Sequence, residues 1–132
     1  MWCHGAIGIG LARMAMAKNT SIHSTRLELD VKRALHGTRL RTNKFNDSLC
    51  CGTMGNIELL KETSLFFSNS KLNEQAIIEL RKTIQNAHQS GKYYLTGTHG
   101  VNPLGLFDGL AGVGYTLLRQ VTTELPNILI FE

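Results

Sequence analysis

Three cysteines stand at two places in this sequence, and each place continues into a Gly-x-x-Gly pattern. Cys3 belongs to the segment WCHGAIGIG, and Cys50 and Cys51 belong to LCCGTMGNI. An odd number of cysteines cannot all pair within one chain, and thiolates are preferred ligands of zinc. Three protein ligands with a fourth position open are typical of a catalytic zinc site. The cysteines therefore predict an open zinc site, provided that folding brings the two segments together.

A cysteine can also be a small apolar residue of the core, which is the main alternative to metal binding. The matching positions of Cys3 and of the Cys50–Cys51 pair favour the metal interpretation. Spacing alone leaves the ligand set open, because His4 or His99 could replace a cysteine. If the cysteines precede helices, the helix dipole favours the thiolate, so a lowered pKa is expected.

The elements that must position these residues follow from the hydrophobic spacing. Both cysteine segments, and a third segment LFDGLAGVG, lead into apolar stretches with helical periodicity at residues 7–17, 57–66 and 113–118. Two amphipathic helices are predicted between them, at residues 27–35 and 77–87, the second ending at Gly91. The final segment PNILIFE is expected to be a short extended piece packed on the body.

The glycine-led segments recur like the units of a helical repeat. Gly5 and Gly52 are 47 residues apart, and Gly52 and Gly109 are 57 apart, in the range of stacked helical hairpins. We therefore predict an all-α chain of about two and a half hairpins in two layers, with apolar helices covered by amphipathic ones. Because the chain begins inside its first motif, it is expected to be the end of something larger.

Composition narrows the class of protein. The chain has 132 residues and 42% hydrophobic content, which suits a single domain. Its basic excess is concentrated in residues 26–44, for which a solvated helix face is favoured over a nucleic-acid surface, since Phe45 is the one aromatic nearby. No stretch is long enough to span a membrane, and the cysteine pattern favours the reducing cytoplasm.

Three ordered motifs carry a family resemblance. The segments WCHGAIGIGLAR, LCCGTMGN and GLFDGLAGVGYTLLR…PNILIFE resemble the C-terminal part of the lanthionine synthetase C-like family, most of all the cyclase domain of class II bifunctional lanthipeptide synthetases. The resemblance covers residues 1–132 and implies an α/α toroid, a double-layer helical barrel, with Zn²⁺ at its centre. It also implies that Cys3, Cys50 and Cys51 are the metal ligands, as in the family's three-cysteine subgroup.

The implied activity is formation of lanthionine and methyllanthionine rings, in which cysteines of a lanthipeptide precursor peptide add to dehydroalanine or dehydrobutyrine. The family's proton-handling residues lie upstream of the Trp-Cys motif, so the isolated chain is expected to be inactive without the missing part of the synthetase. Within the chain, His99 is the candidate acid or base. The alternative is a non-catalytic, zinc-stapled peptide-binding module or an inactive remnant.

Four further residues are expected to support the ligands or to shape the helix mouths, by which we mean the glycine-led segments at the N-terminal ends of the apolar helices. Gly5 and Gly52 would let the backbone turn sharply. His4 is expected to assist its neighbour Cys3. Asp108 occupies the third segment at the place of a cysteine or histidine, where a helix N-cap explains it as well as catalysis does.

Overall fold

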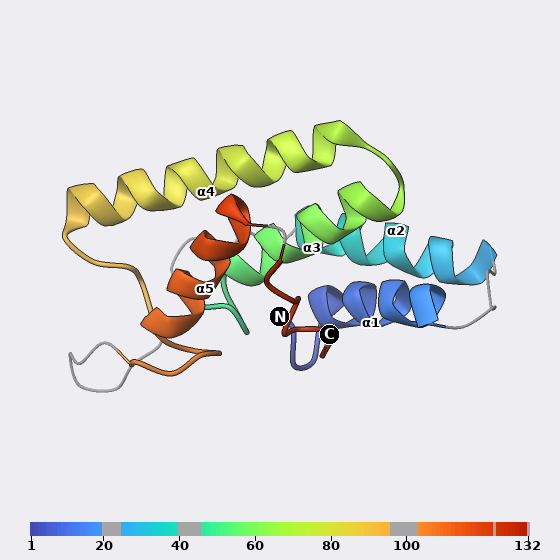
Figure 1. Ribbon diagram of the computed structural model, residues 1–132, viewed down its shortest axis with the longest axis horizontal. Helices are drawn as coiled ribbons and strands as arrows, with labels where there is room; N and C mark the ends of the chain where they lie inside the picture. The colour runs from blue at the N-terminus through green and yellow to red at the C-terminus, as the bar shows by residue number, and fades with distance from the viewer. Residues whose placement is uncertain (20–24, 40–45, 96–102, 123, 132) are drawn as a thin grey trace.

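The computed structural model describes residues 1–19, 25–39, 46–95, 103–122 and 124–131. These residues form the helices α1 (Ala6–Asn19), α2 (Thr25–Arg39), α3 (Thr53–Phe66), α4 (Ser70–Ser90) and α5 (Leu110–Val121) (Figure 1). These described residues contain no strand, so the prediction of an all-α chain is confirmed. None of the helices that these residues form is both long and apolar enough to cross a bilayer.

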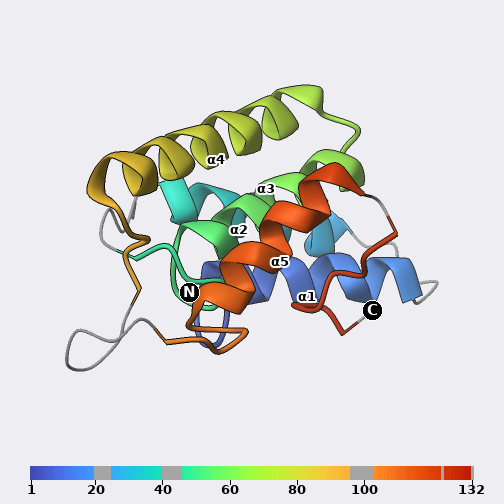
Figure 2. The ribbon, with the colours of Figure 1, turned by 60° about the vertical axis from the view of Figure 1, so that its left-hand side comes forward.

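The helices pack as two hairpins and a single fifth helix. α1 packs on α2, α3 packs on α4, and α5 packs on α3. Figure 2 shows the central position of α3, between α4 and α1. The apolar helices α1 and α5 both contact α3, whereas the amphipathic helices α2 and α4 cover α1 and α3. This is the arrangement of two and a half hairpins in two layers that the repeat pattern predicts.

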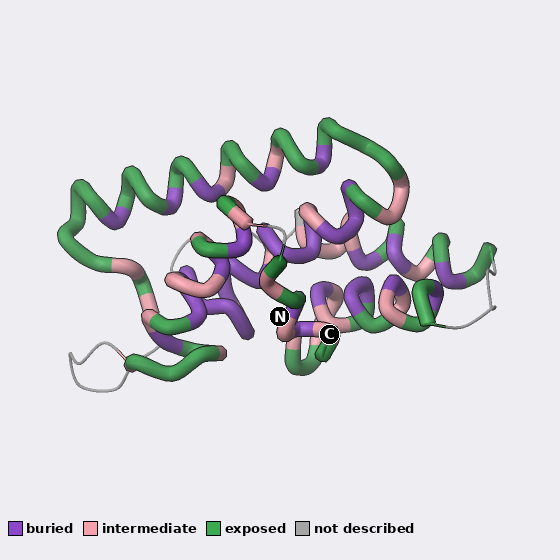
Figure 3. The backbone as a smooth tube through the Cα atoms, viewed as in Figure 1, coloured by how far each residue is buried: buried purple, intermediate pink, exposed green. Residues whose placement is uncertain are grey.

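Burial follows the two kinds of helix. α3 is buried on most sides, and Met54, Ile57 and Leu59 are each 0% exposed. α4 instead buries a single stripe and presents its other side to solvent, as Figure 3 shows. The side chain of Asn69 caps its N-terminus by accepting from the backbone N–H of Lys71. Gly91, with a φ of 73°, ends it where the sequence predicts.

Buried charges connect α3, α5 and the C-terminal tail, which we define as residues 124–131. Arg119 donates from Nε to Glu58 Oε2 at 3.1 Å and from Nη2 to Glu62 Oε1 at 3.0 Å. The Nζ atom of Lys18 in α1 lies 3.3 Å from Glu62 Oε2. Desolvation raises the pKa of Glu58, and the neighbouring Arg119 partly opposes this effect.

The tail packs on the body as expected, but it forms a turn and not an extended piece. Asn127 Oδ1 accepts from the N–H of Leu129 at 3.0 Å, and the Asn127 carbonyl accepts from the N–H of Ile130 at 3.0 Å. Phe131 has a φ of 57°. The asparagine side chain thus offers the apolar residues that follow it a local alternative to a strand.

The described part of the basic region lies on the outer helix α2 and is largely paired. Lys32 is 3.8 Å from Glu28, and Arg33 is 3.7 Å from Asp30. The Lys32 ammonium also lies 5.3 Å from the centroid of the Phe67 ring. These pairs fit a solvated helix face; Arg41 and Lys44 lie outside the described residues.

Candidate metal centre

The three glycine-led segments follow the same backbone path into α1, α3 and α5. In each one, the second glycine lies against the carbonyl of the residue six positions earlier, where a Cβ would collide with backbone. Close approach of two backbone segments therefore requires glycine at this place. The glycine and carbonyl pairs are Gly8 with Trp2, Gly55 with Leu49, and Gly112 with Leu106.

This shared path identifies the equivalent positions in the three segments. Cys3 corresponds to Cys50 and to Phe107, and the next residue is His4, Cys51 or Asp108. The backbone N–H of Trp2 donates to the Cys50 carbonyl at 2.7 Å, and the N–H of Cys50 donates to the Phe107 carbonyl at 2.8 Å. The three helix mouths are therefore linked side by side, with the second one in the middle.

The arrangement brings the three predicted ligands together. Cys51 Sγ lies 3.3 Å from Cys50 Sγ and 4.0 Å from Cys3 Sγ, and all three sulfurs fall within 4.8 Å of one another. Two sulfurs bound to one tetrahedral zinc at about 2.3 Å are separated by about 3.8 Å. The thiol set fits a zinc ion in chemistry and in spacing. No other such cluster of three occurs in the part of the chain that the structure describes.

The expected lowering of the thiol pKa values is wrong for two of the cysteines. Burial raises the pKa of Cys50 to about 12, and the neighbouring thiols add to this effect. Burial also raises the pKa of Cys51. Desolvation and the crowding of like groups outweigh the position ahead of a helix. The two thiols are therefore neutral at pH 7 without a metal, so a bound metal must displace their protons.

The supporting residues lie as follows. His4 is exposed, with Nδ1 2.9 Å from Cys3 Sγ. A Cβ on Gly5 would stand 2.8 Å from the Met1 carbonyl oxygen, and one on Gly52 would stand 2.5 Å from the Ser48 nitrogen, so both glycines shape helix mouths.

The structure describes the surroundings of Asp108 but not those of His99. The N-cap of α5 is Gly109, and it has no side-chain cap, so Asp108 does not cap the helix through its side chain. Asp108 is exposed, and its charge contributes to the raised pKa of Cys51. His99 lies outside the described residues, and its role remains a prediction.

Sequence reasoning missed the groups that surround Trp2. The Trp2 ring stacks on Phe107 with centroids 5.1 Å apart and planes 3° apart. Trp2 Nε1 donates to the carbonyl of Leu129 in the tail at 2.8 Å. One clue was available, because Phe107 takes the place of a cysteine in the third segment.

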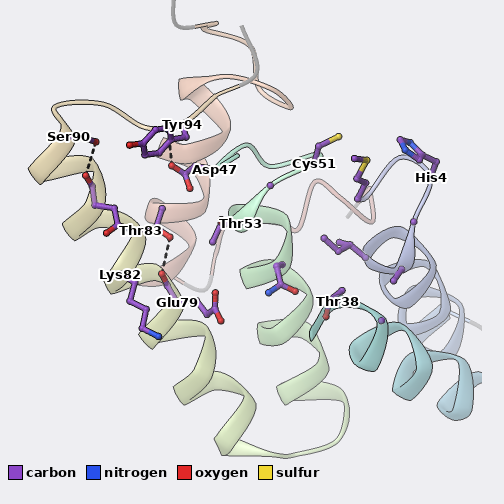
Figure 4. Close-up of a pocket in the computed structure, with 18 of the residues that line it drawn as sticks. His4, Thr38, Asp47, Cys51, Thr53, Glu79, Lys82, Thr83, Ser90 and Tyr94 are labelled. Carbon is purple, nitrogen blue, oxygen red and sulfur yellow. Dashed lines mark hydrogen bonds between the residues drawn. The ribbon is translucent and has the colours of Figure 1, made fainter. Parts of the chain in front are cut away.

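A cleft of about 1390 Å³ opens beside the cysteines (Figure 4). Cys51 and His4 line it together with polar residues of α4, among them Lys82 and Ser90. A smaller hollow of about 350 Å³ adjoins Cys3, and His4 lines both. The thiol cluster can therefore be approached from solvent, as a site that takes a ligand requires.

Residues 1–131 match the family model described as lanthionine synthetase C-like protein. The chain belongs to the lanthionine synthetase C-like family. This lanthionine synthetase C-like chain is also 28% identical over 142 residues to the lacticin 481/lactococcin biosynthesis protein LcnDR2 of Lactococcus lactis subsp. lactis. That alignment covers 91% of the chain and 14% of the relative, so the chain spans a small part of that protein's length. No solved structure matches the chain.

Proposed function

We propose that this chain supplies the zinc site of a lanthipeptide cyclase, with Cys3, Cys50 and Cys51 as ligands. The observation that carries the proposal is the convergence of three sulfurs within 4.8 Å at two helix mouths. Membership of the lanthionine synthetase C-like family supports it. The similarity to a lacticin 481 biosynthesis protein supports a lanthipeptide precursor as the substrate.

The reaction joins a cysteine of the precursor to a dehydroalanine or dehydrobutyrine. A carbon–sulfur bond forms at the β-carbon, and the α-carbon takes up a proton. Zinc, when bound by these thiols, supplies a Lewis acid that lowers the pKa of a thiol at the open fourth position. Cys3 is exposed, so its side of the cluster leaves access for a substrate thiol. The cleft beside Cys51 offers room for the peptide around it.

We further infer that residues 1–132 are the C-terminal portion of a cyclase domain, in a class II synthetase of the cytoplasm. The 14% coverage of the relative supports a longer functional unit. Ring formation then requires the remaining part of the synthetase, and His99 is proposed as a local acid or base. A chain without that part would bind zinc but would not form rings.

Zinc content is the first test. The purified chain is expected to hold about one zinc per molecule by elemental mass spectrometry. The double variant Cys50→Ser, Cys51→Ser should lose it. The variant His88→Ala, which removes an exposed potential ligand on α4, should keep it. Zinc retained in the cysteine variant would contradict the proposed ligand set.

A second measurement separates a cyclase site from a structural zinc staple. Cobalt in place of zinc gives absorption bands that change when the fourth ligand changes. Adding a cysteine-containing peptide should shift the bands of an open site and leave those of a closed site unchanged. With the rest of the synthetase present, ring formation should lower the number of precursor thiols that iodoacetamide can alkylate.

A further inference from the structure

Cys3 has less support around it than the other two cysteines. Cys50 follows a wholly buried segment, residues 46–49, and is itself 7% exposed. Cys3 is exposed, and the segment that carries it, residues 1–5 ahead of α1, is exposed or half-buried throughout. Its Sγ lies 2.9 Å from His4 Nδ1 and 4.0 Å from Cys51 Sγ. Besides the hydrogen bond between the Cys3 backbone and the Cys50 thiol, the support of Cys3 comes through its neighbour in the chain, Trp2.

Trp2 is held by three separate parts of the chain. Its backbone N–H donates to the Cys50 carbonyl, which links it to the second helix mouth. Its ring stacks on Phe107 of the third mouth. Its indole Nε1 donates at 2.8 Å to Leu129, across 127 residues of sequence. These contacts fix the backbone one residue before the Cys3 side chain.

The Leu129 carbonyl is in turn placed by Asn127. Asn127 is 1% exposed, accepts from the Leu129 N–H, and donates from Nδ2 to Glu62 Oε1 at 3.0 Å. Arg119 donates to the same oxygen of Glu62 and also to the Leu125 carbonyl. Glu62, a buried carboxylate of α3, therefore orders the tail just before the turn that presents the Leu129 carbonyl, directly at Asn127 and through Arg119 at Leu125.

We propose that the C-terminal tail positions Cys3 for metal binding through Trp2, and that Asn127 and Phe107 are positioning residues of the metal site. The third helix mouth, which lacks a cysteine, contributes through the Phe107 ring that supports Trp2. This inference rests on the proposed ligand role of Cys3. Groups that orient a metal ligand without touching the metal typically change affinity by about 10- to 100-fold.

The test compares three variants of the chain. Asn127→Leu removes both side-chain hydrogen bonds at similar volume. Trp2→Phe keeps an aromatic ring against Phe107 but loses the indole donor to Leu129. Thr83→Val on α4 is the matched control, because it removes a buried hydroxyl that bonds within its own helix. Circular dichroism establishes that each variant is folded.

Cobalt titration gives a readout that a general loss of stability does not move. We expect the first two variants to bind cobalt about 10- to 100-fold more weakly than wild type. Their thiolate-to-cobalt charge-transfer band should fall by about one third, as one of three thiolates is lost. Thr83→Val should match wild type in both. Unchanged affinity and band intensity in a folded Asn127→Leu variant would overturn the proposal.

A measurement without metal keeps the two proposals distinguishable. Diamide oxidises two nearby thiols to a disulfide, and the yield of the Cys3–Cys51 bond can be followed by peptide mass. If the tail positions Cys3, this yield falls in Asn127→Leu and not in Thr83→Val, whether or not wild type binds metal. Equal yields would refute positioning by the tail. Wild type that binds no cobalt but shows the expected difference in yield would refute only the zinc proposal.

Discussion

At the scale of single residues, Asp47 shows how the second helix mouth is tied to the chain that follows α4. Its backbone N–H donates to the Tyr94 carbonyl at 2.6 Å, and its Oδ2 accepts from the Tyr94 N–H at 2.9 Å. Asp47 is 8% exposed, and burial raises the pKa of its carboxyl above the ordinary value. The carboxylate is useful as an acceptor but is costly as a buried charge.

We predict that Asp47→Asn removes a pH-dependent loss of stability. In wild type the folded state holds the Asp47 proton more tightly, so the free energy of unfolding falls as pH rises from 3.8 to the raised folded pKa. The asparagine keeps an acceptor for Tyr94 but does not titrate. Urea unfolding across a pH series should therefore show that the free energy of unfolding of the variant rises relative to that of wild type through that pH window.

The exposed Glu74 on α4 provides the control for this change, as Glu74→Gln. A difference between Asp47→Asn and wild type that is the same at every pH would show that burial of the charge is not the cause.

The sequence predicted the three cysteines and their convergence because two matching segments marked them. It could not predict the raised pKa of Cys50 or the contact of Trp2 with Leu129. Both depend on what surrounds a residue after folding, and Leu129 lies 127 residues further along the chain. Local spacing carries no information on either.

At the scale of elements, two glycines inside helices have opposite surroundings. A Cβ on Gly10 of α1 would lie 2.8 Å from Leu59 Cδ1 of α3 and 3.0 Å from Ala34 Cβ of α2. A Cβ on Gly37 of α2 would lie 3.4 Å from Ala6 Cβ, which is ordinary contact. Gly10 therefore allows three helices to meet closely, whereas Gly37 has room for a methyl group.

We predict that Gly37→Ala stabilises the fold by about 0.5–1 kcal/mol, because alanine is the better helix former. Gly10→Ala should lower the free energy of unfolding by up to about 2 kcal/mol, because the cost of overpacking against α3 and α2 outweighs the gain in helix propensity. Urea unfolding of the two variants measures the difference directly. Equal effects would mean that α1 can shift away from α3 without cost.

We also predict that Arg119→Leu destabilises the chain by about 3–5 kcal/mol, because Glu58 and Glu62 would lose their shared buried partner. Arg81→Leu, at an exposed position of α4, is the control and should have little effect. The free energy of unfolding at pH 7 decides this. A loss as small as that of Arg81→Leu would show that the other nearby cations, Lys18 at Glu62 and Lys61 near Glu58, suffice for the two carboxylates.

Helix order and type could be predicted because the apolar spacing of each stretch is regular. The turn in the tail could not be predicted in the same way. The Asn127 side chain determines the shape of the tail, and the apolar residues that follow Asn127 do not. The Arg119 network was also missed, as Glu58 and Glu62 look like ordinary polar positions of a helix until α5 covers them.

At the scale of the whole molecule, the inner helices keep apolar side chains in solvent. Ile9 of α1 is 54% exposed, and Leu118 and Val121 of α5 are 55% and 82% exposed. Large exposed apolar patches mark association surfaces. The two-layer packing therefore leaves the sides of α1 and α5 that face away from α3 without cover from the described residues.

We predict that the chain self-associates in solution and that Ile9→Lys with Leu118→Lys reduces this association. Ile78→Lys is the control, because Ile78 is similarly exposed on the outer helix α4. Light scattering across a concentration series gives the mass of the particle. A monomeric wild type, or an equal effect of all three lysines, would contradict the role assigned to these two faces.

The hydrogen bond between Trp2 and Leu129 has a consequence for the order of events during biosynthesis. A ribosome adds about 5–20 residues per second, so Leu129 is made roughly 6–25 s after Trp2. Throughout that interval the nascent chain lacks the contact of Trp2 with the tail, and the links of Trp2 to Cys50 and Phe107 are the ones that can form. The Cys3 thiol is then less firmly positioned, and it is more open to oxidation and to stray metal ions until the last turn is complete.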